Sequence, residues 1–167
     1  MPQSLAEKLK EKILEAFFLE LEQELTTITE AAFAARDAAI SEEARAENKY
    51  DTRGLEASYL AGAQAKRASE LRETISKLRQ NKIRLYHEEE PIQGLALVSV
   101  ESENGETKKF FIVPAEGGAK VQVDGQTVFL VTPESPIGKT LWNLKLGDEF
   151  EFTLKGSKQF YEITSVL

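Results

Sequence analysis

The sequence has no cysteine and a single histidine, His87. Without cysteine, the chain cannot form disulfides, cysteine-ligated zinc sites or a catalytic thiol. One histidine excludes a histidine-rich metal site and disfavours a serine–histidine triad. Proline is also scarce in the first half of the chain, where none occurs between Pro2 and Pro91. These absences remove most common kinds of enzyme site and allow long, uninterrupted helices in the first half of the chain.

The charge balance and hydropathy exclude two further classes. The 167 residues include 28 acidic and 21 basic side chains, for a net charge of −7. A surface that coats DNA or RNA needs a basic field, which this chain lacks. No run of about 18 apolar residues could span a bilayer, and the first residues lack the apolar segment of a secretory signal. We expect a cytoplasmic protein with no membrane partner.

Composition changes near residues 81–94. Alanine, leucine, glutamate, lysine and arginine dominate before this point, which is typical of long helices. Valine, phenylalanine, threonine and paired turn residues dominate after it. The segment YHEEEPIQ around residues 86–93 joins a charge run to Pro91 and marks the boundary. We predict an α+β protein, with an antiparallel helical hairpin over residues 1–85 and a second domain over residues 86–167.

Apolar and small residues in the first half recur in alternating steps of four and three, the spacing of a coiled-coil seam. The incoming seam is Leu14, Phe18, Leu21, Leu25, Ile28, Ala32, Ala35 and Ala39, and the outgoing seam is Ala57, Ala61, Gln64, Ala68, Leu71, Ile75 and Leu78. If Leu14 faces Leu78, facing positions sum to about 92 and the chain reverses near residue 46. Alanines toward the turn allow close helix axes, so we expect a tapering rod that suits a narrow channel.

Helix boundaries follow from capping residues. The first helix is predicted to begin at Ser4, an N-cap with Glu7 at the capping-box spacing, and to run to about residue 45. The second is predicted from residue 51 or 55 to about residue 84, with Asp51 or Thr52 as N-cap. Its cations, including Lys66, Arg67 and Arg72, indicate either a solvated face or a basic patch along a nucleic-acid strand.

Residues 41–54, SEEARAENKYDTRG, form the predicted tip of the hairpin and carry little apolar content. Its carboxylates are Glu42, Glu43, Glu47 and Asp51. The tip is either a solvated turn or an acidic site held at the end of a rod. Carboxylates are hard oxygen ligands that suit Mg²⁺, so an acidic site at the tip could bind this ion.

The second half alternates short apolar segments with turn signals. Asn104-Gly105 and Asp124-Gly125 are hairpin signals. Ser135-Pro136 is an N-cap followed by proline at the first helical position, which predicts a short helix through Trp142. Strands are predicted at 95–101, 110–113, 121–123, 128–131, 149–154 and 160–166. We expect a small antiparallel sheet with one helix covering a face.

The segment SPIGKTLWNLKLGDEFEF, followed by FYEITSV, resembles the C-terminal domain of the bacterial transcription elongation factors GreA and GreB. The matching positions are Ser135, Pro136, Ile137, Gly138, Leu141, Gly147, Asp148, Tyr161, Glu162 and Ile163. The first half is similar to the family's acid-tipped coiled coil, with Glu47-Asn48 before Tyr50 and with Tyr59 three residues before Gly62. The resemblance covers most of the chain.

The resemblance implies an FKBP-like C-terminal domain that binds RNA polymerase and a coiled coil that enters the polymerase secondary channel. It implies that two tip acids help to hold a second Mg²⁺ at the polymerase active site, where backtracked RNA is cut. The protein would be an accessory monomer, not itself an enzyme, sharing that Mg²⁺ and having no cofactor of its own. It would meet the nascent RNA 3′ end indirectly, with Lys66, Arg67 and Arg72 as candidate contacts.

The tip departs from the family pattern in spacing and in residue type. Aligned on Tyr50, its spacing is one residue short, and the two acid positions fall on Glu43 and on Ala46, which is not an acid. The family places an aspartate three residues before the glutamate of Glu-Asn, and Ala44 stands there in this chain. We select Glu43 and Glu47 as the pair assisting the polymerase Mg²⁺, with Asp51 and Glu42 in reserve. One helical turn apart, Glu43 and Glu47 face the same way if the first helix continues.

The same departure supports an alternative, a Gre-like regulator or inhibitor that occupies the channel without cleavage. The FKBP-like fold suggests a third hypothesis, a prolyl isomerase or chaperone, although fold alone does not carry function.

Overall fold

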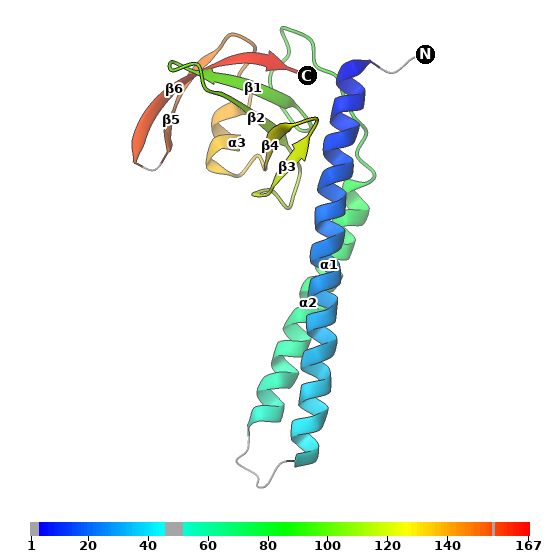
Figure 1. Cartoon of the computed structure of the whole chain (residues 1–167). Helices are drawn as coiled ribbons and strands as arrows, with labels where there is room; N and C mark the ends of the chain where they lie inside the picture. The colour runs from blue at the N-terminus through cyan, green and yellow to red at the C-terminus, as the bar shows by residue number, and fades with distance from the viewer. Residues whose placement is uncertain (1–3, 46–51, 155) are drawn as a thin grey trace. The chain divides into compact units, whose positions relative to one another are not determined.

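A computed structural model describes residues 4–45, 52–154 and 156–167 (Figure 1). The chain divides into two compact units, one formed by Met1–Phe17 with Asn81–Leu167 and the other by Phe18–Gln80. Helix α1 (Leu5–Arg45) contributes to both. In the described ranges, no helix is long and apolar enough to cross a membrane.

The first helix begins as predicted, with a reciprocal capping box. The Ser4 backbone N–H donates to Oε2 of Glu7 at 2.7 Å, and the Glu7 N–H donates to Oγ of Ser4 at 3.1 Å. Two N–H groups that the first helical turn leaves without backbone partners are thereby satisfied. The helix is described as far as Arg45, and the residues that follow lie outside the described ranges, so its predicted end stays a prediction.

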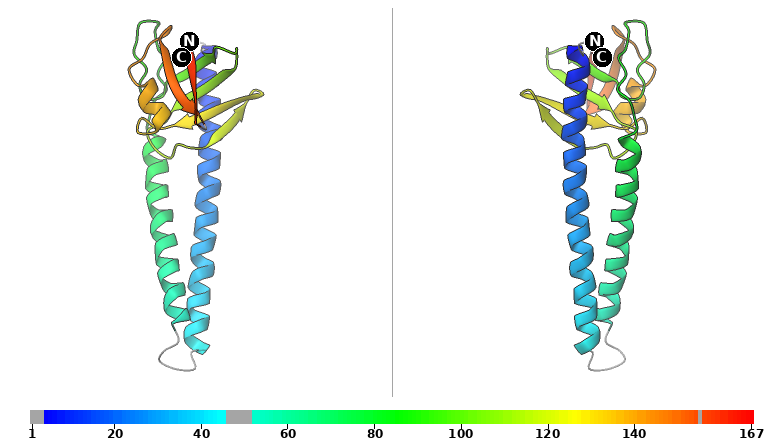
Figure 2. Two further views of the ribbon diagram at one scale, coloured as in Figure 1. Left: turned by 90° about the vertical axis from the view of Figure 1, so that its left-hand side faces the viewer. Right: turned by 90° about the vertical axis from the view of Figure 1, so that its right-hand side faces the viewer.

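The hairpin unit pairs α1 with the antiparallel helix α2 (Arg53–Leu78), which runs along it (Figure 2). Every residue of the two predicted seams is buried or half-buried. An ion pair of 3.1 Å joins Glu24 to Arg67, positions that the predicted register sets opposite each other. The coiled-coil register is therefore confirmed, the taper stays a prediction, and the predicted reversal at residue 46 lies outside the described residues.

The second helix ends earlier than predicted, at Leu78 rather than near residue 84. The backbone beyond it contributes to the sheet-containing unit instead. Lys10 donates from Nζ to the carbonyl of Arg84, and the Tyr86 hydroxyl donates to the carbonyl of Gly94 at 2.8 Å. These tertiary hydrogen bonds and the burial of Tyr86 compete with continuation of the helix. At the other end, Thr52 occupies the N-cap position without a side-chain cap bond.

The second half forms a six-stranded sheet in the order β3-β4-β2-β1-β6-β5. The strands are β1 (Leu97–Ser102), β2 (Thr107–Ile112), β3 (Lys120–Val123), β4 (Gln126–Val131), β5 (Glu149–Leu154) and β6 (Ser157–Val166). Both predicted hairpins form. At the β3–β4 turn, Asp124 and Gly125 both have positive φ, 50° and 76°, as a two-residue type I′ turn requires.

The sheet is mixed, which corrects the expectation of an antiparallel sheet. Strands β2 and β4 pair in parallel, with Phe110 in register with Phe129. Turn residues determine only that β1 pairs with β2 and β3 with β4. They do not determine which strand of the second hairpin lies beside the first, and here β4 does so.

The short helix α3 (Pro136–Leu141) lies on one face of the sheet, which curves around it (Figure 1). The Gly138 N–H donates to Oγ of the N-cap Ser135 at 3.1 Å, as the sequence predicts. The core lies between α3 and the sheet, where Leu141 is fully buried with Val98, Ile112 and Ile163.

Candidate functional site

The predicted acidic tip lies where α1 ends and α2 begins. Oε2 of Glu42 is 3.6 Å from Nε of Arg53, so the last turn of α1 is paired with the first turn of α2. Glu43 lies on α1, and the structure describes its backbone alone. Glu47 and Asp51 lie outside the described residues. The arrangement of the selected pair therefore stays a prediction.

The pairing with Arg53 gives Glu42 a structural task. A carboxylate beside a guanidinium is partly neutralised and is a weaker ligand for a divalent cation than a free carboxylate. The ion pair joins the described ends of the two helices. Within the parts of the chain that the structure describes, no group of three or more His, Asp or Glu side chains could hold a metal ion.

The three cations predicted as RNA contacts do not form one patch. Nζ of Lys66 is 3.8 Å from Glu70, and Arg67 pairs with Glu24. Arg72 borders a groove between the helices. At 3.6 residues per turn, positions 66, 67 and 72 point in well-separated directions around α2. An RNA contact through them stays a prediction.

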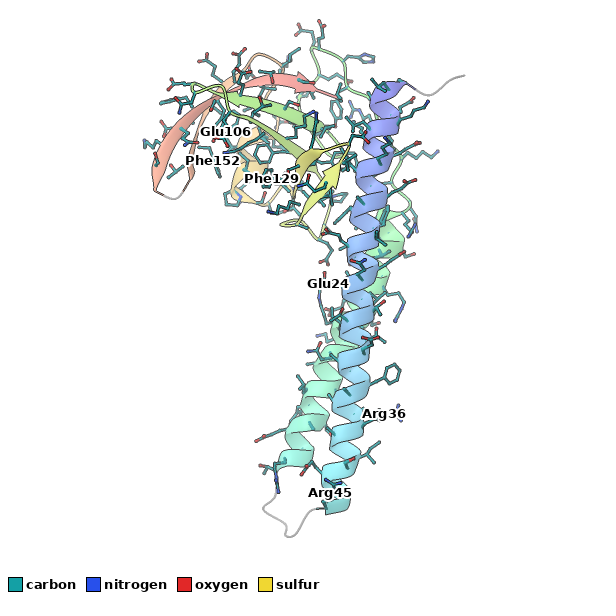
Figure 3. All side chains as sticks on the ribbon, in the orientation of Figure 1. Glu24, Arg36, Arg45, Glu106, Phe129 and Phe152 are labelled. Carbon is teal, nitrogen blue, oxygen red and sulfur yellow. The ribbon has the colours of Figure 1, made fainter. Side chains whose placement is uncertain are left out.

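The sheet-containing unit has an apolar pocket of about 190 Å³. Its lining is Val100, Lys108, Phe110, Phe129, Ile137, Phe150, Phe152 and Tyr161. Phe110 and Phe129 have ring centroids 5.7 Å apart, and Phe150 stacks on Tyr161 at 5.5 Å. Figure 3 labels Phe129 on β4 and Phe152 on β5. Five strands and α3 contribute to this concavity, so it exists only in the folded domain.

One charged group stands at the pocket rim. Nζ of Lys108 donates to the Tyr161 hydroxyl at 3.1 Å and is 3.5 Å from Oε1 of Glu106. Partial burial acts to lower the pKa of Lys108, but the hydrogen bonds and charges of Tyr161 and Glu106 outweigh it and raise that pKa. The lining residues include no carboxylate and no histidine. The pocket therefore suits an apolar side chain of a partner better than acid–base chemistry.

Sequence analysis missed this pocket, because the phenylalanines alternate along their strands as core residues do. Ile137 on α3 lines the pocket together with these phenylalanines. The sequence signal that could have indicated the pocket is the concentration of phenylalanine in the second half of the chain.

Comparison with known proteins gives a family match over the second half of the chain. Residues 92–167 match a family model described as "Transcription elongation factor, GreA/GreB, C-term". No curated protein matches the chain.

Three solved structures are similar in fold. GreA factor homolog 1 (Gfh1) of Thermus thermophilus is 21% identical, with 90% of this chain and 94% of that chain covered and a TM-score of 0.37. Thermus aquaticus Gfh1 is 22% identical, with 91% and 94% covered and a TM-score of 0.39. A GreA/GreB factor from Nitrosomonas europaea is 18% identical, with 79% and 92% covered and a TM-score of 0.36.

Proposed function

We propose that this chain docks on RNA polymerase and stimulates cleavage of backtracked RNA, on the premise that residues 92–167 match the family model of the GreA/GreB C-terminal domain. The C-terminal domain would provide the anchor and the hairpin tip would provide the chemistry. The family match is the observation that carries the proposal.

The apolar pocket supports the anchoring role. Clefts lined by aromatic side chains with a few polar groups at the rim are typical binding sites. Phe129, Phe150 and Phe152 present such a lining, with Lys108 at the rim. Interface energy is commonly concentrated where an apolar or aromatic anchor fills such a pocket. We therefore assign the polymerase contact to an apolar side chain of the polymerase seated in this pocket.

The hairpin supports the tip role. Its small seam residues, Ala35 and Ala39, are buried and keep the end of the rod thin. The pair between Glu42 and Arg53 joins the helix ends and gives the tip a defined base. Glu43 and Glu47 would supply carboxylate oxygens to the polymerase Mg²⁺, and the donor type fits that ion. The bound Mg²⁺ would stabilise the attacking and leaving oxygens of phosphodiester cleavage.

A transcript-cleavage assay tests the proposal. RNA polymerase is stalled and backtracked with labelled RNA, then mixed with this protein and Mg²⁺. New short 3′ fragments should appear, and the double variant Glu43→Ala with Glu47→Ala should lose them while still binding polymerase. A matched control, Glu30→Ala with Asp37→Ala, removes two acids of α1 away from the tip and should retain cleavage. Unchanged cleavage by the tip variant would contradict the site.

Ala44 favours a second candidate function, a channel-occupying regulator that does not cleave. The family's aspartate is absent at this position, so the tip has one fewer carboxylate for a cation. This candidate expects polymerase binding without new fragments, together with displacement of an active cleavage factor in the same assay. Dose-dependent fragments from the wild-type chain would exclude it.

A further inference from the structure

A groove of about 420 Å³ runs between α1 and α2 on one flank of the hairpin. Small residues line it, including Ala32, Ala61 and Ala68. Its larger lining residues are Phe33, Arg36 and Arg72. All of these belong to the hairpin unit, so the groove is a feature of that unit alone.

One large apolar side chain of the groove, Phe33, is not part of the coiled-coil seam. The Phe33 side chain is 59% exposed, although aromatic side chains of this size are usually buried against other apolar groups. Leu19 and Ile40 are each 57% exposed. These three residues are separated by multiples of seven positions, so they share one face of α1, with Thr26 between Leu19 and Phe33. Of the three, Phe33 lines the groove, and an exposed aromatic ring beside a groove is a feature of interaction surfaces.

Charge identifies the kind of partner. Arg67 and Arg79 pair with Glu24 and Glu22. Among the described residues, neither Arg36 nor Arg72 has a carboxylate partner, and Figure 3 labels Arg36 on α1. Two guanidinium groups left without carboxylates in a chain of net charge −7 are complementary to carboxylates supplied from outside.

We propose that this groove docks an acidic amphipathic helix of RNA polymerase, an inference that rests on the proposed function. Alanines at the floor let a third helix approach closely, since axis separation is set by the side chains at the contact. Aliphatic residues one turn apart on that helix would seat on the floor against Phe33. Its flanking carboxylates would bind Arg36 and Arg72.

A nucleic-acid strand fits the groove less well. Strand binding needs a basic field along the backbone, whereas only two arginines line this groove and the chain as a whole has a net charge of −7. A helix contact would also fix the rotation of the hairpin about its own axis. The tip acids would then face a defined direction, which the C-terminal pocket alone cannot ensure.

Gly62 allows the groove to be filled without damage to the fold. It lines the groove, and a Cβ built there would meet nothing within 4 Å. Leucine and alanine are both better helix formers than glycine. Gly62→Leu should therefore block the groove while the hairpin stays folded, and Gly62→Ala is the matched control.

The test is site-specific photocrosslinking to core RNA polymerase. A benzophenone amino acid replaces Phe33 in one variant and, in another, the exposed Lys139 on α3 beside the C-terminal pocket. Both variants should crosslink to polymerase, and mass spectrometry should map the Phe33 crosslink to an acidic helical segment. Gly62→Leu or Arg36→Glu with Arg72→Glu should lower the Phe33 yield about tenfold. Gly62→Ala should leave it unchanged.

The outcomes separate the two proposals. Crosslinks from Lys139 but none from Phe33 would overturn the groove proposal and leave the proposed function standing. A Phe33 crosslink to RNA would replace the helix with a nucleic-acid strand and would equally overturn it. No crosslink from either position, with no measurable binding, would overturn both.

Discussion

The hairpin unit and the sheet-containing unit each have an apolar concavity, and the two are built in opposite ways. The hairpin groove is lined mainly by alanines and Gly62, with two arginines that lack carboxylate partners in the described chain. The pocket of the sheet is lined by four phenylalanines, and its one cation, Lys108, is already paired. Small residues leave space between two helices, whereas large residues surround space between strands. The hairpin groove therefore suits a helix of a partner, and the pocket of the sheet suits a single side chain.

The two units should also differ in how much stability one side chain provides. Leu141 is fully buried against the sheet, so Leu141→Ala should cost about 2–5 kcal/mol. Ala39→Gly in the hairpin removes only a methyl group from a helix and should cost about 1 kcal/mol. Denaturant unfolding followed by Trp142 fluorescence and by far-UV circular dichroism would measure both. Equal losses of unfolding free energy would show that one buried side chain contributes as much to stability in the hairpin as in the sheet.

Lys10 should give the sheet-containing unit a pH-dependent stability. Its side chain is fully buried over Tyr86, and burial followed by the charge of Arg84 lowers the pKa of Lys10 from its usual 10.5 to about 8. Between pH 8 and 10.5 the unfolded chain binds more protons at Lys10 than the folded chain does. Stability should therefore rise through this window, by on the order of 3 kcal/mol at most.

The measurement is the free energy of unfolding of wild type and Lys10→Met as pH is raised. The difference between them should change between pH 8 and 10.5. Lys108→Met is the control. The pKa of Lys108 is raised, so the stabilisation that this lysine provides is fully present below pH 10.5 and is lost only above that pH. Its difference from wild type should stay constant through the window. If the difference in unfolding free energy between wild type and Lys10→Met stays constant through this window, the lowered pKa of Lys10 is refuted.

Two helical glycines sharpen the comparison between the units. A Cβ on Gly138 of α3 would lie 1.9 Å from the carbonyl oxygen of Thr132, so Gly138→Ala should cost about 1–3 kcal/mol. Gly62→Ala in α2 meets nothing and should gain about 1 kcal/mol. Thermal melts of both variants would measure the shifts. A stabilising Gly138→Ala would mean that the loop at Thr132 moves without cost.

The smallest expected effect is at the start of α1. Ser4→Ala removes the hydroxyl that accepts from the Glu7 N–H and should cost about 1 kcal/mol. Ser4→Asp keeps an acceptor and should cost much less. Amide hydrogen exchange of the first turn of α1 would detect the change. Equal protection in Ser4→Ala and wild type would show that other contacts hold this end.

The sequence by itself determined the features that depend on near neighbours. The seams from Leu14 to Leu78, the Ser4–Glu7 capping box and the Asp124-Gly125 turn all follow from local spacing, because helix and turn geometry fix which nearby residues share a face. The tip acids were recognised from composition and resemblance, although Glu47 and Asp51 lie outside the described residues.

Only the tertiary structure decided which distant residues become neighbours. It paired β2 with β4 in parallel and so brought Phe110 to Phe129 in the pocket. It ended α2 at Leu78 and directed the next backbone carbonyls to partners such as Lys10. It also left Arg36 and Arg72 beside a groove. Periodicity cannot specify these outcomes, since each depends on the free energy of burying surfaces far apart in the chain.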